Sequence, residues 1–278
     1  MGLSPQTAIE LPVTRELAEL YVGNEVVPGL FEPFRVWGLC SRVVDVARVD
    51  SGAEARAAHG LAEVPEEFPV GDGLFVLRFL AGWPGLFRAA RAPAAIPEYW
   101  MDLAEIPIGA ELWHLAEDGS DEYEQKVAHF AGRHSGWQAY PVARERGLVP
   151  SAAAEKPASS VHRGLFATHQ GAAYPADFGP DAGELTAYQT AQDGSVIAHK
   201  LTESQCDEIE YRRVLTTWRG LRFELLAAEE QNATLVHITG DAQQATELGL
   251  TPAGRHAWRV QVPKSELETV TEETQKIG

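Results

Sequence analysis

The sequence predicts an α+β fold made mostly of antiparallel sheets, with short helices packed on one face. Within 221–226, apolar residues alternate with Arg222 and Glu224, which is typical of a strand with one buried and one solvated face. Asp193 and Gly194 separate two apolar segments of strand-like composition, and this dipeptide favours a two-residue hairpin turn. Both observations predict strands that pair with their neighbours in the sequence.

The segment 235–262 is the third observation. It has the pattern of a strand, a turn, a helix over 242–248, a stop at Gly249 and a final strand. A fainter copy of this pattern occupies 46–79, where Gly60 aligns with Gly249. An internal duplication would explain the likeness and would give two pseudo-symmetric α/β lobes. Common packing rules would also produce such a unit twice without duplication.

The other elements follow from local composition. Thr14 is a suitable cap for a short helix that begins directly after it. The three prolines within 81–100 predict a long connection with one helical turn near Phe87, and the charged tail after Pro263 is expected to begin as a helix. The remaining predicted elements are helices over 53–59 and before Gly147, one or two strands over 34–49, and strands over 74–80, 110–116, 125–130, 161–168 and 209–217.

The segment 150–160, PSAAAEKPASS, is small, polar and proline-bearing, which favours a linker. We therefore expect an N-terminal α/β lobe over 1–150, a linker over 151–160 and a C-terminal α/β lobe over 161–278. Lobes that meet in this way commonly leave a groove between them, and this groove is the predicted binding region.

The chain has 40 acidic and 23 basic residues, and its formal net charge is −17. This balance argues against nucleic-acid binding through phosphate contacts, because such binding needs clustered Lys and Arg. A solvated acidic surface explains the charge without any function. A surface that attracts a basic partner is the functional alternative.

Cellular location is inferred from what the sequence lacks. No apolar run approaches the roughly 20 residues that a membrane-spanning helix needs, and the N-terminus has no secretory pattern. The two cysteines, Cys40 and Cys206, form neither a redox pair nor a metal-binding pattern. We expect a cytoplasmic protein without membrane contact, and the sequence does not predict its oligomeric state.

Catalytic signatures are absent from the sequence. It contains no Gly-x-Ser-x-Gly nucleophile turn and neither of the common glycine-rich phosphate loops. His129 and His134 are five residues apart, one more than the spacing that places two metal ligands on one helix face. We expect no metal and no cofactor, and the sequence identifies no catalytic residue.

The candidate binding residues form a basic, aromatic segment within an acidic chain: Arg212, Trp218, Arg219 and Arg222. Guanidinium groups of this kind bind an anionic ligand or an acidic partner surface. The alternative is that they pair with carboxylates of their own chain across neighbouring strands. His237, on the clearest predicted strand, is the fifth candidate.

Two hypotheses for the function remain. The first is a non-catalytic protein-binding module of the antitoxin, immunity or adaptor type, which recognises a basic partner through an acidic surface. The alternative is a small-molecule enzyme or ligand sensor with its site in the cleft between the two lobes. A cavity that gathers His129, His134 or His237 with perturbed carboxylates would favour an enzyme.

Overall fold

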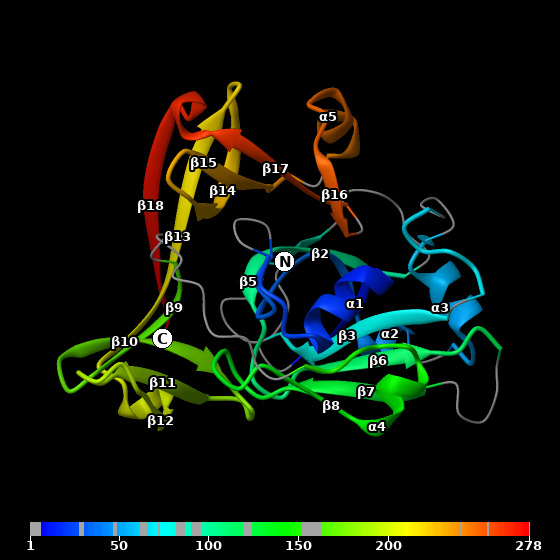
Figure 1. Cartoon of the computed structure of the whole chain (residues 1–278), viewed down its shortest axis with the longest axis horizontal. Helices are drawn as coiled ribbons and strands as arrows, with labels where there is room; N and C mark the ends of the chain where they lie inside the picture. Colours follow the sequence, from blue (N-terminus) through cyan, green and yellow to red (C-terminus); the bar gives the residue numbers. More distant parts are fainter. Residues whose placement is uncertain are drawn as a thin grey trace.

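The computed structural model describes residues 7–27, 31–46, 49–61, 66–71, 73–81, 87–89, 96–118, 124–151, 163–239, 241–254 and 256–277. In this part of the chain, the strands form two large antiparallel sheets, one from residues before 140 and one from residues after 163 (Figure 1). The predicted class of α+β fold dominated by antiparallel sheet is confirmed in this broad form. Apart from Ser151, the predicted linker lies outside the described residues, so the division into two lobes stays a prediction.

The first sheet has the strand order β4-β5-β2-β1-β3-β6-β7-β8. Although β1 comes first in the chain, it lies near the centre of the sheet, and all but the first of its residues are buried. The strands are β1 (Ala8–Val13), β2 (Arg35–Arg42), β3 (Leu74–Leu80), β4 (Phe87–Ala89), β5 (Glu98–Glu105), β6 (Glu111–Leu115), β7 (Glu124–Phe130) and β8 (Trp137–Ala139).

Short helices pack on both faces of the first sheet, so the predicted one-face arrangement is wrong. The physical reason is β3, LFVLRFL, which places apolar side chains on both faces and therefore needs cover on both. One face packs against α1 and the opposite face packs against α3. The helices of this half are α1 (Arg15–Val22), α2 (Val43–Val46), α3 (Gly52–Ala58) and α4 (Pro141–Glu145).

Side-chain caps explain where two of these helices begin. The hydroxyl of Thr14 accepts a hydrogen bond from the backbone N–H of Leu17 at 3.3 Å, as the sequence predicts. Ser51 caps α3 in the same way, by accepting from the backbone N–H of Glu54 at 3.2 Å.

The second sheet is organised around β13, whose outer edge along 209–217 pairs with β18. Its inner edge therefore holds both β9 and β14, one after the other. The path of strands is β12-β11-β10-β9-β13-β14-β15-β17-β16. The elements are β9 (Gly164–His169), β10 (Ala172–Phe178), β11 (Glu184–Thr190), β12 (Val196–Thr202), β13 (Glu208–Trp218), β14 (Leu221–Ala228), β15 (Asn232–His237), α5 (Ala242–Glu247), β16 (Thr251–Gly254), β17 (Ala257–Pro263) and β18 (Thr269–Ile277).

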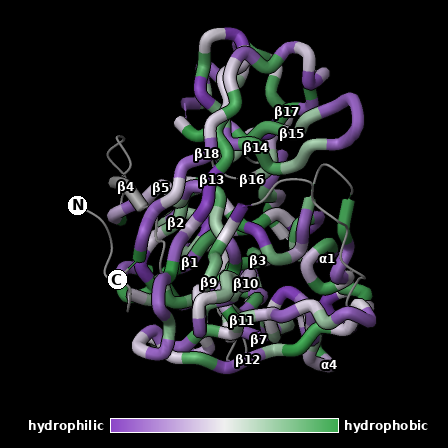
Figure 2. Tube along the Cα trace, turned by 90° about the vertical axis from the view of Figure 1, so that its left-hand side faces the viewer, coloured by the Kyte–Doolittle hydropathy of each residue, from purple (hydrophilic) through white to green (hydrophobic). Residues whose placement is uncertain are grey.

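The long strands β13 and β18 give the second sheet two parts. In Figures 1 and 2, β14, β15 and β17 lie above the level of the first sheet. In Figure 1, β9 to β12 lie lower, at the level of the first sheet and next to it. The upper part contacts the first sheet through a small apolar cluster, made of Trp37 and Leu103 from one sheet and Leu226, Val236 and Ala257 from the other. The second sheet thus packs around one end of the first.

Several local predictions are corrected by the structure. The tail after Pro263 forms only a short 3-10 turn, 264–266, before it becomes β18. Phe87 lies in β4 rather than in a helical turn, and the second part of 34–49 contains helix α2 instead of another strand. Strands β1, β5, β8, β10 and β16 were not predicted, whereas the hairpin of β11 and β12 around Asp193 and Gly194 is confirmed.

The structure does not confirm an internal duplication. The capped helix and the following glycine do occur twice, with backbone φ of 63° at Gly60 and 66° at Gly249. The surroundings differ, because α5 follows strand β15, whereas helix α2 precedes α3 in the chain. The two sheets also have different strand orders. The likeness is therefore local, and it does not indicate where a binding groove lies.

Candidate functional site

The junction of the two sheets is a buried cluster of charged side chains centred on Arg133. This arginine follows β7, and its Nε donates to Asp177 Oδ1 of β10 at 2.8 Å. Its second terminal nitrogen donates to Glu105 Oε2 of β5 at 2.6 Å. Burial alone would lower the pKa of Arg133, but the carboxylates of Asp177 and Glu105 outweigh it and raise that pKa. Arg133 therefore stays charged and binds both halves of the chain.

Tyr188 completes this part of the cluster. Its hydroxyl donates to Asp177 Oδ2 at 2.6 Å, and burial together with the Asp177 carboxylate raises the pKa of the phenol. A phenol that keeps its proton is a hydrogen-bond donor and not a base. The arrangement therefore orients Asp177 toward Arg133.

A second charged group lies on the upper part of the junction, around Glu224 of β14. Arg163 donates to Glu224 Oε1 at 2.9 Å, and Arg213 donates to Glu224 Oε2 at 2.8 Å. Arg213 also approaches Asp102 of β5 at 3.4 Å, which joins this group to the first sheet. The side chains of Arg163 and Glu224 are fully buried. We interpret these groups as structural, because their charges are paired with one another and largely closed to solvent, although Arg163 Nε and Glu105 Oε1 have no hydrogen-bond partner in the described part of the chain.

Glycine is required where the two halves approach most closely. Gly164 has φ of +101°, and a Cβ at this position would collide with the carboxylate of Glu105. Gly132, at φ of +108°, similarly leaves room for the hydroxyl of Tyr188. Both positions need the left-handed backbone region, which glycine alone adopts without strain.

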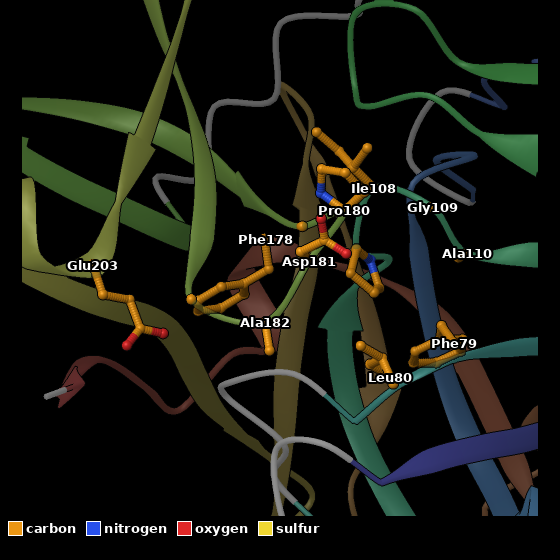
Figure 3. A pocket seen from close by; sticks show the side chains of 13 residues that line it. Phe79, Leu80, Ile108, Gly109, Ala110, Phe178, Pro180, Asp181, Ala182 and Glu203 are labelled. Atoms are coloured by element: carbon orange, nitrogen blue, oxygen red, sulfur yellow. The ribbon is translucent and has the colours of Figure 1, made fainter.

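A cavity of about 470 Å³ opens beside this cluster, between the two halves. Its wall from the first half is formed by the end of β3 and by 107–110, and its wall from the second half is formed by 178–183 and Glu203. Figure 3 shows side chains of both walls, including Leu80, Ile108, Phe178 and Asp181. A backbone hydrogen bond of 2.7 Å from Ile108 to Phe178 joins the walls.

The predicted cluster of basic and aromatic residues contacts acidic residues of the same chain. Trp218 Nε1 donates to Glu266 at 2.9 Å, and Arg222 pairs with Glu273 of β18 at 3.0 Å. The guanidinium of Arg219 stacks over the Trp218 ring at 4.4 Å. These residues lie together at the β13–β14 hairpin, where they contact the C-terminal segment.

Arg212 and His237 lie apart from that hairpin turn. Arg212 donates to Glu210 at 2.6 Å and stacks over the Phe166 ring at 4.0 Å. His237 is fully buried, and its Nε2 lies 2.7 Å from the side-chain oxygen of Gln244. Burial lowers the pKa of His237 despite that hydrogen bond. A binding role for the five predicted residues stays a prediction.

Strand β18 is an exposed edge of the second sheet. It pairs with β13 on one side, and no strand in the described part of the chain pairs with its other side. Its residues from Thr269 to Thr274 are exposed, including Glu272 and Glu273. The preceding residues Glu266 and Glu268 are exposed as well, so the edge is acidic from Glu266 to Glu273. Near its end, β18 carries one exposed lysine, Lys276, which pairs with Glu208 of β13.

Another buried polar group lies in the first sheet and was not predicted from the sequence. Glu10 of β1 contacts His59 Nε2 at 2.8 Å and accepts a hydrogen bond from Arg78 Nε at 2.6 Å. Ser41 is the neighbour of Glu10 on β2. The Ser41 hydroxyl and His59 Nδ1 have no hydrogen-bond partner in the described part of the chain. Because Glu10, Ser41 and His59 are fully buried, we interpret the group as structural.

The histidines do not converge on the cavity, whose lining contains none of them. Within the described ranges, no three His, Cys, Asp or Glu side chains are placed to hold a metal ion. No helix in those ranges has both the length and the apolar character to cross a membrane. A second, more open pocket of about 650 Å³ lies on the first half, where Arg15, His114, Glu117 and Arg146 are among its lining residues. We base the functional proposals on the cavity between the halves and on the acidic edge.

Comparison with known proteins gives no relative for this chain. No protein-family model, no curated protein and no solved structure matches it.

Proposed function

We propose that this protein is a non-catalytic protein-binding module that recognises a basic partner through its acidic C-terminal edge. The observation that supports the proposal is strand β18, which is nine residues long, exposed on both faces and unpaired along its outer edge in the described part of the chain. An edge strand of this kind offers a row of backbone N–H and C=O groups to an extended segment of another protein.

The side chains of β18 define which segment fits. Glu272 has no ion-pair or hydrogen-bond partner among the described residues, and Glu273 has only the exposed contact with Arg222. An added strand that carries Lys or Arg would place its charges beside these carboxylates. Backbone pairing would supply affinity, and the charges would favour basic segments and speed their association.

The second sheet has another outer strand, β12, which serves as an internal comparison. Val196 and Ile197 are exposed on it, at 40% and 47%, but it carries Lys200 and no acidic residue. Charge therefore distinguishes the two edges. A basic partner is expected on β18 and not on β12.

Affinity capture from extracts of the native cells tests the proposal. The baits are the wild-type chain, Glu272→Lys on β18, and Glu247→Lys on exposed α5 as a control with the same charge change. We expect a basic protein to be captured by the wild type and by Glu247→Lys, and capture by Glu272→Lys to fall by about three- to tenfold. Equal capture by all three baits would rule out recognition through β18.

A second function, the binding of a small molecule, is supported by the cavity between the two halves. Its volume of about 470 Å³ lies in the range of natural ligand sites, and both halves contribute to its walls. The absence of histidine from the lining favours a ligand sensor over an enzyme. Ligand occupancy would then influence how the two halves pack.

A further inference from the structure

The walls of the cavity combine apolar side chains with two carboxylates. Phe79, Leu80 and Ile108 line it from the first half, and Phe178 and Pro180 line it from the second. Leu80, the last residue of β3, is 38% exposed and so presents apolar surface at the cavity. A ligand with an apolar body would cover this surface and gain hydrophobic free energy.

The two carboxylates, Asp181 and Glu203, belong to the second half of the chain. Both residues are exposed, and neither carboxylate has a hydrogen-bond or ion-pair partner among the described residues. The lining contains no Lys, Arg or His to balance them. In Figure 3, Glu203 and Phe79 lie at opposite ends of the view, with Asp181 between them. The cavity thus has an apolar wall and an uncompensated negative charge.

The shape of the cavity is fixed by close backbone contacts and not by flexible side chains. Gly179 has φ of +95°, and a Cβ there would collide with the carbonyl oxygen of Ile108. Gly109, at φ of +87°, lies next to Pro180, where an added Cβ would approach the proline Cβ at 3.3 Å. A rigid site of this kind loses little conformational freedom when a ligand binds.

We propose that this cavity binds a small organic amine, in which a protonated nitrogen is attached to an aromatic or aliphatic group. The ammonium would contact the Asp181 carboxylate, the Glu203 carboxylate would add to the negative potential of the cavity, and the apolar group would cover Leu80 and Phe178. Anionic ligands such as nucleotides or carboxylates are disfavoured, because two carboxylates without a counter-charge would repel them. The proposal rests on the second function above and names its ligand class.

Three related probes test the ligand class: 2-phenylethylamine, 2-phenylethanol and 3-phenylpropionate. Each is titrated into the full chain while the methyl resonances of Leu80 and Ile108 are followed by NMR. We expect the amine to bind about tenfold more tightly than the alcohol, and the carboxylate to bind most weakly.

Four variants locate the binding. Asp181→Asn and Glu203→Gln should each lower the affinity for the amine by about three- to tenfold and leave the affinity for the alcohol unchanged. The control is Glu230→Gln, at an exposed glutamate outside the cavity lining, which should change neither affinity. Ala182→Trp places a large ring at an exposed lining residue and should abolish binding of every probe.

The outcomes separate the two proposals. Equal affinity for the amine and the alcohol, or an amine affinity that Asp181→Asn and Glu203→Gln leave unchanged, would overturn the amine class while the cavity remained a ligand site. If no probe perturbs Leu80 and Ile108 at about 10 mM, the weakest affinity expected of a fragment of this size, both the amine class and the ligand-binding function are overturned.

Discussion

The sheet junction and the β18 edge both contain arginine–carboxylate pairs, but in opposite surroundings. The side chain of Arg133 is 4% exposed and contacts two carboxylates that are also buried. The side chains of Arg222 and Glu273 are 63% and 50% exposed and form a single contact. A buried pair cannot lose one partner without leaving an unsolvated charge, whereas an exposed pair exchanges its partner for water at little cost. The junction therefore fixes the structure, and the edge leaves its carboxylates accessible to another molecule.

The largest effect is expected from Arg133→Met, which leaves Asp177 buried without a counter-charge and leaves Glu105 with only the 3.5 Å ion pair to Arg35. We expect a loss of about 3–5 kcal/mol in the free energy of unfolding, measured by urea denaturation. Arg144→Met, at an exposed position of α4, should change it by less than about 0.5 kcal/mol. Similar losses for the two variants would show that the junction charges are not structural.

Glu10 forms a second buried ion pair, within the first sheet, and the stability that this pair provides depends on pH. Burial raises the pKa of Glu10, but the hydrogen bond and charge of His59 and the charge of Arg78 outweigh it, so the pKa lies below its ordinary value of 4.5. The stability that this group provides is thus present above pH 4.5 and is lost as the pH falls through the lower, folded-state pKa.

Glu10→Gln should therefore cost about 2–3 kcal/mol at pH 7 and flatten the decrease of stability in acid. Urea denaturation at a series of pH values measures both effects. A variant with an unchanged acid profile would contradict the assigned role of Glu10.

Backbone approach at the junction is tested by Gly164→Ala. The new methyl group would meet the Glu105 carboxylate, and the backbone would be held at φ of +101°. We expect a loss of about 2 kcal/mol or more, from strain and displacement of the carboxylate. Gly171→Ala is the matched control, because φ is +77° there and the space around it is open; it should cost about 1 kcal/mol. Equal losses would show that Glu105 has room to move.

The smallest effect is expected at the edge, from Arg222→Met. Its contact with Glu273 is exposed, so its removal should change the free energy of unfolding by less than about 0.5 kcal/mol. The same variant leaves Glu273 without its partner, and binding of a basic protein should be retained or strengthened. If the free energy of unfolding fell by more than about 1 kcal/mol, the pair of Arg222 and Glu273 would stabilise the fold as the buried junction pairs do, which would contradict the comparison.

The sequence predicted those parts of the fold that depend on local signals. The cap at Thr14 and the turn at Asp193 and Gly194 involve residues only a few positions apart. β18 escaped prediction because it is exposed on both faces and so lacks the alternation of apolar and polar residues that marks a half-buried strand.

The candidate sites could not be predicted from the sequence, for a different reason. Arg133 meets Glu105 and Asp177 across 28 and 44 residues, and nothing in the local composition pairs them. The cavity likewise combines the end of β3 with the turn before β11. The one available signal was glycine beside charged or turn residues, as at Gly132 and Gly179, but this pattern is too common to locate a site.

Hydrogen–deuterium exchange of the chain, alone and with the captured basic protein, tests the central claim most directly. The proposal predicts that the amides of β18, Thr269–Ile277, become protected on binding, because their outward N–H groups pair with the added strand. The amides of β12, the other outer strand, should exchange as before. Protection at β12 or elsewhere, with β18 unchanged, would contradict recognition through the acidic edge.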